Sequence, residues 1–467
     1  MKFKSDVVIG IECHIELNTA SKLFCGCPTK ADKPNSACCE VCLGMPGSKP
    51  VLNKKAVEYA LKLCIALDCK VSPELIFSRK SYFYPDMAKN YQISQYEIPL
   101  GKNGKLKISN KIIGIRRVHM EEDPAALIHP ETMLKSKYVL VDYNRSGHPL
   151  VEVVTEPDLN SPEEAREFMN KLITILRYLD IFDINDGIIK ADANISIKET
   201  GYTKVEIKNI TGFKDIERAM FYEVSRQKNN IREVKQETRA WDSTAGLTRA
   251  LRTKETEEDY GYILDPDLTR VEITEDWIEK IKQDMPELAE AKIEKFISKH
   301  KISKLDAEAI SQEKLLADLF EKVAVEVNPE LAAKWLRREL VRVLNYNKKS
   351  LKDLKLDEKH LIDLLKLIET KQITDKVGQK LMEKLIQEPF DIKGYVKNEN
   401  LLAVSDTDLI ENICRKVIKE NKKAVEDYKK GGEKALHYLI GQVMKETKGK
   451  ATPKEVNEIL KKLISKR

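Results

Sequence analysis

The sequence has little glycine and lacks the short motifs that identify several common enzyme classes. Only 19 of its 467 residues are glycine, well below the roughly 7% of average proteins. The phosphate-binding patterns G-x-x-x-x-G-K-[ST] and G-x-G-x-x-G, the nucleophile pattern G-x-S-x-G and the metalloprotease pattern H-E-x-x-H are all absent. If the protein binds ATP, it therefore does so without a P-loop.

Long apolar runs are missing as well. No stretch approaches the roughly 18 consecutive apolar residues that a transmembrane helix needs. Near the amino terminus, Glu12, His14 and Glu16 fall where a secretory signal peptide requires an unbroken apolar core. The sequence therefore predicts a cytoplasmic protein without a membrane span.

Charge is plentiful but unevenly distributed. Charged residues make up 33% of the chain and hydrophobic residues 42%, and the net charge is +6. Residues 411–467 contain 16 Lys or Arg against 8 Asp or Glu, whereas the preceding 410 residues contain 65 against 67. A basic segment of this kind is typical of binding to a phosphate backbone, although a solvated lysine-rich helical surface would give the same count.

The length and the residue pattern indicate three units. At about 150 residues per domain, the chain corresponds to roughly three domains. Short alternating apolar and polar runs dominate the first part of the chain. Helix-start signals dominate the rest, such as Asn328-Pro329 and the capping box from Thr452 to Glu455. The predicted fold class is α+β, with a mainly antiparallel sheet domain at 1–290, a helical connector at 291–400 and a small basic helical tail at 401–467.

Polar side chains share one face of several predicted strands. In the first strand, apolar residues alternate from Val7 to Leu17, which places Glu12, His14 and Glu16 together on the opposite face. A half-solvated strand shows the same alternation, so this strand alone decides little. The arrangement recurs in four further runs, whose polar faces carry Arg117, His119, Glu121 and Asp123; Glu152 and Glu156; Lys190, Asp192, Asn194, Ser196 and Lys198; and Lys204, Glu206 and Lys208.

If these strands are neighbours, their acids converge on one surface. Carboxylates that lie close together repel each other unless a cation holds them, and carboxylate oxygens with an occasional imidazole suit Mg²⁺ or Mn²⁺. In the segment HMEED, Glu121 shares a face with His119, whereas Glu122 shares one with Val118 and Met120. The pattern predicts a divalent-metal site and favours Glu121 over Glu122 as a ligand.

Lys80 lies in the aromatic-rich segment SRKSYFYPD. A lysine in an ordered stretch of this kind can hold a phosphate as a point charge. An ordinary surface lysine would look the same in the sequence, so Lys80 stays a candidate at this point.

Two short cysteine pairs form a second candidate site. Cys25 and Cys27 are followed after a short loop by Cys39 and Cys42. This spacing is typical of a structural zinc site with four thiolates, and Cys38 is an alternative ligand beside Cys39. A cluster of free thiols is the competing interpretation.

Longer motifs resemble one known family. The segments IECHIEL, LFCGCPT, CLGMPGSKPVLN, SYFYPDMAKNYQISQYEIPL, HMEEDPAALIH, VDYNRSGHPLVEVVTEPD, ADANIS, KVEIKNI, QETRAWD and GEKALHYLIGQVMKETKGKATP are similar to the B subunits of the aspartyl/glutamyl-tRNA amidotransferases. The resemblance runs in the family's order from about residue 7 to the end. The related E subunits carry a large inserted domain, for which this chain has no room.

The resemblance implies an ATP-dependent ligase. In that family the amino-terminal domain phosphorylates the side-chain carboxylate of Asp-tRNA(Asn) or Glu-tRNA(Gln). Ammonia from a separate amidase, the A subunit, then displaces the phosphate, in a heterotrimer that includes a small C subunit. The family's Mg²⁺ ligands correspond to His14, Glu121 and Glu152, with Glu12 beside them and Asp192 as a further ligand.

The resemblance also assigns the remaining candidates. Lys80 and Lys208 are candidates for contacts with the phosphates of ATP. Structural Zn²⁺ is expected at Cys25, Cys27, Cys39 and Cys42. The basic tail is expected to contact tRNA, with candidate phosphate contacts at Lys445, Lys448 and Lys450.

Two other functions fit parts of the pattern. A noncatalytic, zinc-containing tRNA-binding module would explain the cysteines and the basic tail. A metal-dependent phosphohydrolase or nuclease would explain the acids. The first would not turn over ATP, and the second would cleave tRNA without ATP.

Overall fold

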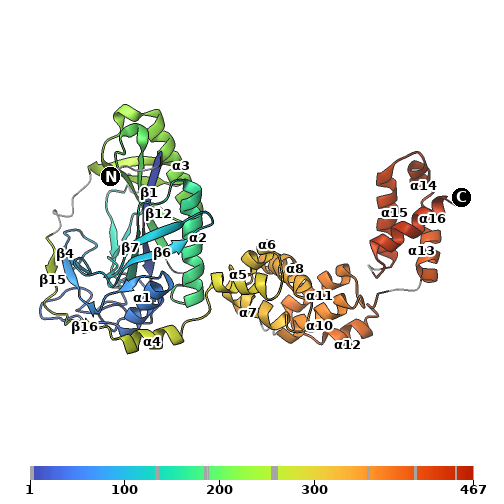
Figure 1. The fold of residues 1–467 in the computed structure, drawn as a ribbon, viewed down its shortest axis with the longest axis horizontal. Coiled ribbons are helices and arrows are strands. Elements are labelled where there is room, and N and C mark those ends of the chain that lie inside the picture. The colour runs from blue at the N-terminus through green and yellow to red at the C-terminus, as the bar shows by residue number, and fades with distance from the viewer. Residues whose placement is uncertain are drawn as a thin grey trace. The chain divides into compact units, whose positions relative to one another are not determined.

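The computed structural model describes residues 5–131, 136–183, 187, 189–253, 261–354, 358–403, 407–447 and 450–465. The chain divides into two compact units, Met1–Leu288 and Ala289–Arg467. Within the described residues, every strand belongs to the first unit and the second unit is helical (Figure 1). The α+β class is therefore confirmed, while the predicted further division near residue 400 stays a prediction.

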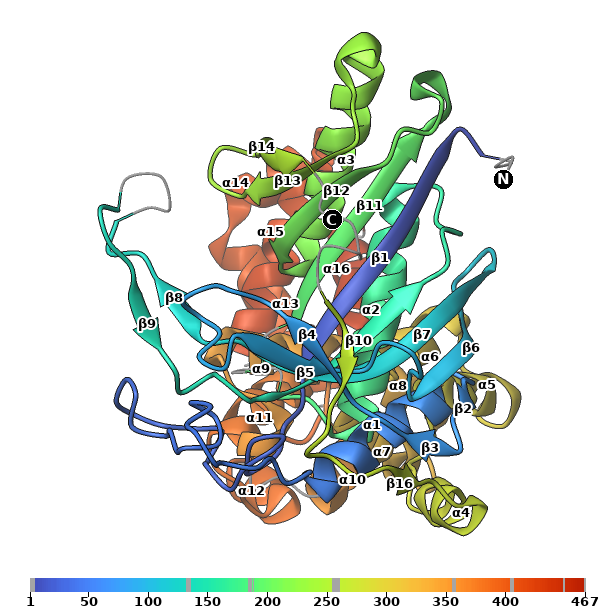
Figure 2. The ribbon, with the colours of Figure 1, turned by 90° about the vertical axis from the view of Figure 1, so that its left-hand side faces the viewer.

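A nine-stranded sheet forms the centre of the first unit. Its neighbouring strands are antiparallel except for β12 and β13, which are parallel. The first strand, β1, lies in the middle of the sheet between β11 and β10 (Figure 2). In sheet order the strands are β14 (Leu247–Thr253), β13 (Glu237–Asp242), β12 (Val205–Thr211), β11 (Ile189–Ile197), β1 (Val7–Glu16), β10 (Pro149–Thr155), β7 (Ile112–Glu122), β6 (Gly101–Lys107) and β2 (Lys70–Val71).

Three small antiparallel sheets accompany the large one. They join β15 to β4 and β5, β16 to β3, and β8 to β9. Their strands are β3 (Glu74–Leu75), β4 (Ser78–Ser81), β5 (Tyr91–Ser94), β8 (Ala126–Ile128), β9 (Leu140–Asp142), β15 (Ile263–Leu264) and β16 (Val271–Glu272).

Helices cover one face of the large sheet. Helices α1 (Lys54–Ala66), α2 (Pro162–Leu179) and α3 (Phe213–Asn229) pack there, and α4 (Glu275–Gln283) packs against α1 (Figure 1). The odd-numbered residues of β1 from Ile9 to Ile15 are buried in this interface, where the Sγ atom of Cys13 lies 3.2 Å from the Sδ atom of Met169 on α2. Because side chains alternate along a strand, the even-numbered residues of β1 point to the other face.

The second unit consists of helices whose starts were partly predictable. The Asn328 side chain accepts a hydrogen bond from the Leu331 amide at 3.1 Å, and Thr452 accepts one from the Glu455 amide at 3.3 Å. Both are N-caps that the local sequence predicts. The helices are α5 (Ala289–Ser298), α6 (Lys304–Ile310), α7 (Lys314–Val323), α8 (Pro329–Lys334), α9 (Val341–Asn347), α10 (Glu358–Glu369), α11 (Asp375–Gln387), α12 (Ile392–Asn398), α13 (Thr407–Glu420), α14 (Lys422–Lys429), α15 (Glu433–Glu446) and α16 (Pro453–Ser465), with a π-helical turn at Trp335–Leu340.

The last four helices enclose a hydrophobic core of their own. Its buried members include Ile410 and Cys414 on α13, Leu439 on α15 and Leu460 on α16. Between these apolar positions the helices expose many lysines. Among the residues that the structure describes, no helix combines the length and the apolar character required to cross a membrane.

Candidate functional site

One histidine and two carboxylates meet on the face of the sheet opposite the one covered by α1, α2 and α3. His14 on β1, Glu152 on β10 and Glu121 on β7 come from three adjacent strands, and His14 is the direct cross-strand partner of Glu152. The Nδ1 atom of His14 lies 3.3 Å from Oε1 of Glu121 and 3.9 Å from Oε2 of Glu152. One ligand atom from each residue lies within 4.8 Å of the others. The three predicted magnesium ligands therefore lie close enough to hold one ion.

A second histidine, His119, lies beside these three residues, although the sequence did not single it out as a metal ligand. His119 is the cross-strand partner of Glu152 on its other side, and its Nε2 atom lies 3.2 Å from Oε2 of Glu152. Its only signal in the sequence is that it lies two residues from Glu121, which predicts that both side chains are on the same face of the strand. Its position favours a role in orienting Glu152.

The cluster is strongly anionic. Burial alone lowers the pKa of His14, but the carboxylates of Glu152 and Glu121 outweigh burial and raise the pKa to about 10. Burial raises the pKa of Glu152, but His119 and His14 outweigh it and hold the pKa below the usual range of a glutamate. A divalent cation would supply positive charge that these acids attract.

Further acids extend the cluster along β1 and β11. Glu12 pairs with Asp192 across these strands, and the Asn194 side chain donates a hydrogen bond to Glu12 at 3.0 Å. Burial, followed by the neighbouring carboxylates of Glu152 and Asp192, raises the pKa of Glu12. Such crowding of carboxylates is relieved by a cation. Both residues therefore belong to the same anionic surface as the three candidate ligands.

The two candidate phosphate-binding lysines lie near these acids. The Nζ atom of Lys208 on β12 is 3.6 Å from Oδ2 of Asp192 and 3.8 Å from Oε1 of Glu206. Lys80 lies on β4, in a different sheet, and its charge helps to lower the pKa of Glu152. Both ammonium groups thus border the acid cluster.

The choice between Glu121 and Glu122 has a clear geometric basis. Glu122 points away from His14 and forms an ion pair with the buried Lys89, and its carboxylate also accepts a hydrogen bond from the Ile93 amide at 2.8 Å. Its Oε1 atom is therefore already engaged by both partners. Lys89 was not a candidate, because a contact between residues 33 positions apart leaves no local pattern in the sequence.

Glu156 does not join the cluster, although simple alternation places it beside Glu152. The pairing of β10 with β7 shifts register between Val154 and Thr155. Beyond this irregularity, Glu156 forms an ion pair with Arg116 at 2.8 Å and its side chain is 41% exposed. The shift skips Arg116 on β7, because Val154 pairs with Arg117 and Thr155 with Ile115, so Glu156 is engaged by this arginine and not by the acid cluster.

The four predicted zinc ligands also meet. Sulfur atoms of Cys25, Cys27, Cys39 and Cys42 all lie within 4.8 Å of one another. The Sγ atoms of Cys39 and Cys42 are 3.9 Å apart, close to the roughly 3.8 Å expected for two thiolates on a tetrahedral zinc with Zn–S bonds of about 2.3 Å. The alternative ligand Cys38 stands outside this group, with its sulfur 3.8 Å from Oδ1 of Asn144.

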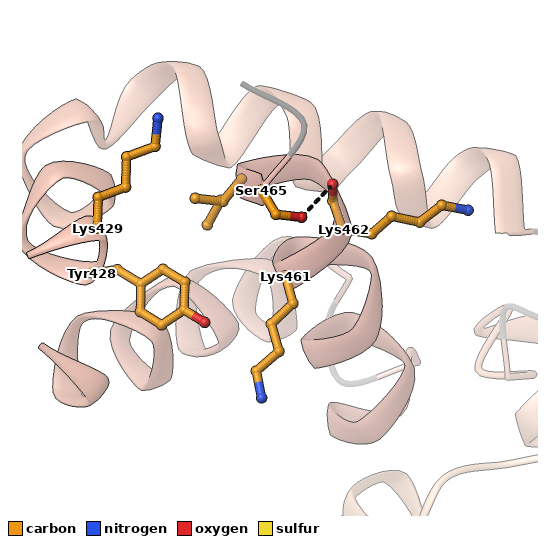
Figure 3. Close-up of a pocket in the computed structure, with 6 residues that line it drawn as sticks. Tyr428, Lys429, Lys461, Lys462 and Ser465 are labelled. Carbon is orange, nitrogen blue, oxygen red and sulfur yellow. Dashed lines mark hydrogen bonds between the residues drawn. The ribbon is translucent and has the colours of Figure 1, made fainter. Parts of the chain in front are cut away.

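Basic side chains gather in the tail helices. Lys445 is exposed near the end of α15, and Lys450 precedes α16, whereas Lys448 lies outside the described residues. A further hollow of about 500 Å³ between α14 and the end of α16 is lined by Tyr428, Lys429, Lys461, Lys462, Ile464 and Ser465 (Figure 3). The three lysines of this hollow extend in different directions (Figure 3), which suits an extended polyanion better than a single phosphate.

The features of the two units agree with two protein-family models. The first unit carries a cluster of acids and histidines on the sheet face away from its helices and a separate group of four cysteines, and the second unit carries a basic helical surface. Residues 7–279 match the family model described as the GatB/GatE catalytic domain, and residues 318–464 match the model described as the GatB domain.

Full-length relatives identify the family. The B subunit of the aspartyl/glutamyl-tRNA(Asn/Gln) amidotransferase from Caldanaerobacter subterraneus subsp. tengcongensis is 43% identical, with 99% of this chain and 100% of that protein covered. Proteins of the same name from Thermodesulfovibrio yellowstonii and Saccharolobus solfataricus are 44% and 43% identical, each with 98% of this chain and 99% of the relative covered. The chain belongs to the family of aspartyl/glutamyl-tRNA(Asn/Gln) amidotransferase B subunits, which confirms the resemblance seen in its motifs.

Proposed function

We propose that the chain is the kinase and transamidase subunit of a tRNA-dependent amidotransferase, a carbon–nitrogen ligase that uses glutamine as amide donor. Its substrates are ATP and the misacylated Asp-tRNA(Asn), Glu-tRNA(Gln) or both. Its partners are the amidase (A) subunit, which supplies ammonia, and the small (C) subunit, in a cytoplasmic heterotrimer. The observation that carries the proposal is the convergence of His14, Glu121 and Glu152, one ligand atom of each lying within 4.8 Å of the others, on the sheet face away from the helices.

The chemistry needs charge and alignment more than it needs a base. A side-chain carboxylate is already ionised at neutral pH, so it can attack the γ-phosphorus of ATP directly. The bond to the bridging oxygen breaks, ADP leaves and an acyl phosphate forms. Ammonia then attacks the carbonyl carbon and phosphate departs. Such reactions depend mainly on positioning and on neutralising the charge of the phosphoryl group.

The residues of the site suit these tasks. Carboxylate oxygens and an imidazole fit Mg²⁺, which when bound supplies positive charge next to the phosphoryl oxygens. His119 holds the carboxylate of Glu152 at 3.2 Å. Lys80 and Lys208 provide ammonium groups for phosphates at the border of the cluster. Glu12 and Asp192 add negative charge beside the three ligands.

The proposal can be tested through its intermediate. The reconstituted complex is mixed with γ-labelled ATP and Asp-tRNA or Glu-tRNA without an ammonia source, and hydroxylamine is added to trap the acyl phosphate as a hydroxamate. Hydroxylamine displaces the labelled phosphate, so we expect release of labelled phosphate together with a hydroxamate on the amino acid, and both should require the misacylated tRNA. A noncatalytic tRNA-binding module would give neither product, and a nuclease would shorten the tRNA without ATP on a denaturing gel.

We also propose that Cys25, Cys27, Cys39 and Cys42 hold a structural Zn²⁺. Four thiolates fill a tetrahedral shell and leave no position for a reacting water, so this ion would have no part in the chemistry. We expect about one equivalent of zinc per chain in metal analysis, and its loss when Cys39 and Cys42 are both replaced by Ser. Cys38→Ser is the matched control, and loss of zinc in this control would reassign the ligands.

The basic tail is the proposed tRNA-binding surface. Lys445 and Lys450 flank the turn between α15 and α16, and Lys448, proposed with them, lies outside the described residues. The hollow formed by Lys429, Lys461 and Lys462 adds a second group of ammonium donors on the same small helical core. Each phosphate contact contributes roughly one unit to the salt dependence of binding.

A further inference from the structure

A completely buried lysine lies beside the four-cysteine site. Lys22 is 0% exposed. Its Nζ atom donates hydrogen bonds to the Ala37 carbonyl at 2.8 Å, to the Tyr143 carbonyl at 3.3 Å and to the sulfur of Cys42 at 3.6 Å. An ammonium group has three N–H donors, and these three acceptors match them in number.

The charge of Lys22 has no carboxylate to balance it. Among the described residues, no carboxylate lies within ion-pair distance of its Nζ atom, and both of its oxygen partners are uncharged backbone carbonyls. An uncompensated charge is strongly disfavoured in a protein interior. The remaining acceptor is the sulfur of Cys42. As a thiolate, this sulfur supplies the missing negative charge.

We propose that Lys22 is the cationic hydrogen-bond partner of the metal-bound Cys42 thiolate, so that the buried ammonium and the loaded four-cysteine site stabilise each other. This inference rests on the proposed zinc site. Four thiolates around Zn²⁺ carry a net charge of −2, and one buried ammonium halves it. An N–H···S bond also draws electron density from the thiolate, which makes the sulfur less basic and less open to electrophiles.

The same ammonium joins the cysteine loop to the segment that leads into β10. Tyr143 belongs to this segment, in which the Ser146 hydroxyl donates to the Cys42 carbonyl at 3.2 Å and the Gly147 carbonyl accepts from the Leu23 amide at 2.8 Å. The stem of Lys22 passes Gly147 closely, since a Cβ atom at that glycine would lie 3.5 Å from Cδ of Lys22. A purely structural role of Lys22, as a bridge between carbonyls, is therefore the alternative to test.

Three substitutions of Lys22 in the full-length protein separate charge from bridging. Lys22→Met keeps the stem but removes all donors, Lys22→Gln keeps two neutral N–H donors but removes the charge, and Lys22→Arg keeps the charge. Zinc affinity is measured by competition with a chromophoric chelator, and the Co²⁺-substituted proteins report the energy of the sulfur-to-cobalt charge-transfer band. Lys30→Met is the matched control, because Lys30 lies near the same loop with a side chain that is 66% exposed.

We expect Lys22→Met and Lys22→Gln to bind zinc about 10- to 100-fold more weakly than the native protein and to shift the cobalt band to longer wavelength. Lys22→Arg and Lys30→Met should change neither quantity appreciably. Native zinc affinity and band position in Lys22→Gln would overturn the inference, even if Lys22→Met does not fold. A native protein that binds no zinc would instead defeat the four-cysteine site itself.

Discussion

A Glu152→Gln variant should form the acyl phosphate on the order of 10²- to 10³-fold more slowly than the native protein. Glutamine keeps the shape of the side chain but removes the charge that faces His14 at 3.9 Å and His119 at 3.2 Å. It therefore weakens the cation site and the charge balance at the phosphoryl group, a loss of the size seen when one electrostatic contact to a transition state is removed. Single-turnover label transfer from ATP to misacylated tRNA measures the effect.

Glu156→Gln is the control for this experiment. Glu156 follows Glu152 by four residues but pairs with Arg116 outside the cluster, so its replacement should leave the rate within about twofold. The affinity of both variants for tRNA should remain native, since neither substitution touches the helical unit. A Glu152→Gln protein that keeps the native single-turnover rate would refute the assignment of the cluster as the kinase site.

Removal of the tail should mainly weaken the use of tRNA. The buried positions of Ile410 and Cys414 show that α13 belongs to the core of the last four helices, so the truncation should begin before Thr407, at residue 404. We expect the KM for aminoacyl-tRNA to rise at least about tenfold, because several phosphate contacts are lost. The KM for ATP should stay within about twofold.

Charge substitutions in the full-length chain refine this test. Replacing Lys429, Lys461 and Lys462 with Gln should raise the KM for tRNA and lower the slope of log affinity against log salt by roughly one unit per lost contact. The control replaces Lys102, Lys105 and Lys107, which are exposed on β6 in the first unit, and so removes the same charge elsewhere. Equal effects of the two triple variants, or an unchanged KM after truncation, would contradict a tRNA-binding tail.

Local patterns predicted the elements, and partly the site. Alternation along β1 placed Glu12, His14 and Glu16 on one face, and the caps at Asn328 and Thr452 were readable because their hydrogen bonds span only three residues. The convergence of Glu121 with His14 required the further assumption that their strands belong to one sheet. That assumption depends on pairing between segments 107 positions apart, which no local pattern encodes.

Long-range contacts account for the features that could not be predicted from the sequence. The pair of Lys89 with Glu122 and the burial of Lys22 arise only when distant segments pack together. The ion pair of Glu156 with Arg116 goes with a register shift that skips Arg116 on β7, and such a shift depends on both paired strands. Contacts of this kind depend on the tertiary structure, and the alternation of side chains along a single strand does not predict them.

The central place of β1 in the sheet sets a constraint on biosynthesis. Its two neighbours begin at Pro149 and Ile189, so the ribosome must translate about half of the first unit before this early segment can pair with the first of them. At roughly 5–20 residues per second, that interval lasts on the order of 10 s or more. During this interval, the alternating isoleucines of β1 are not yet buried between the sheet and its helices. The nascent chain therefore has a natural window for chaperone binding, and slowing translation after residue 16 should increase aggregation.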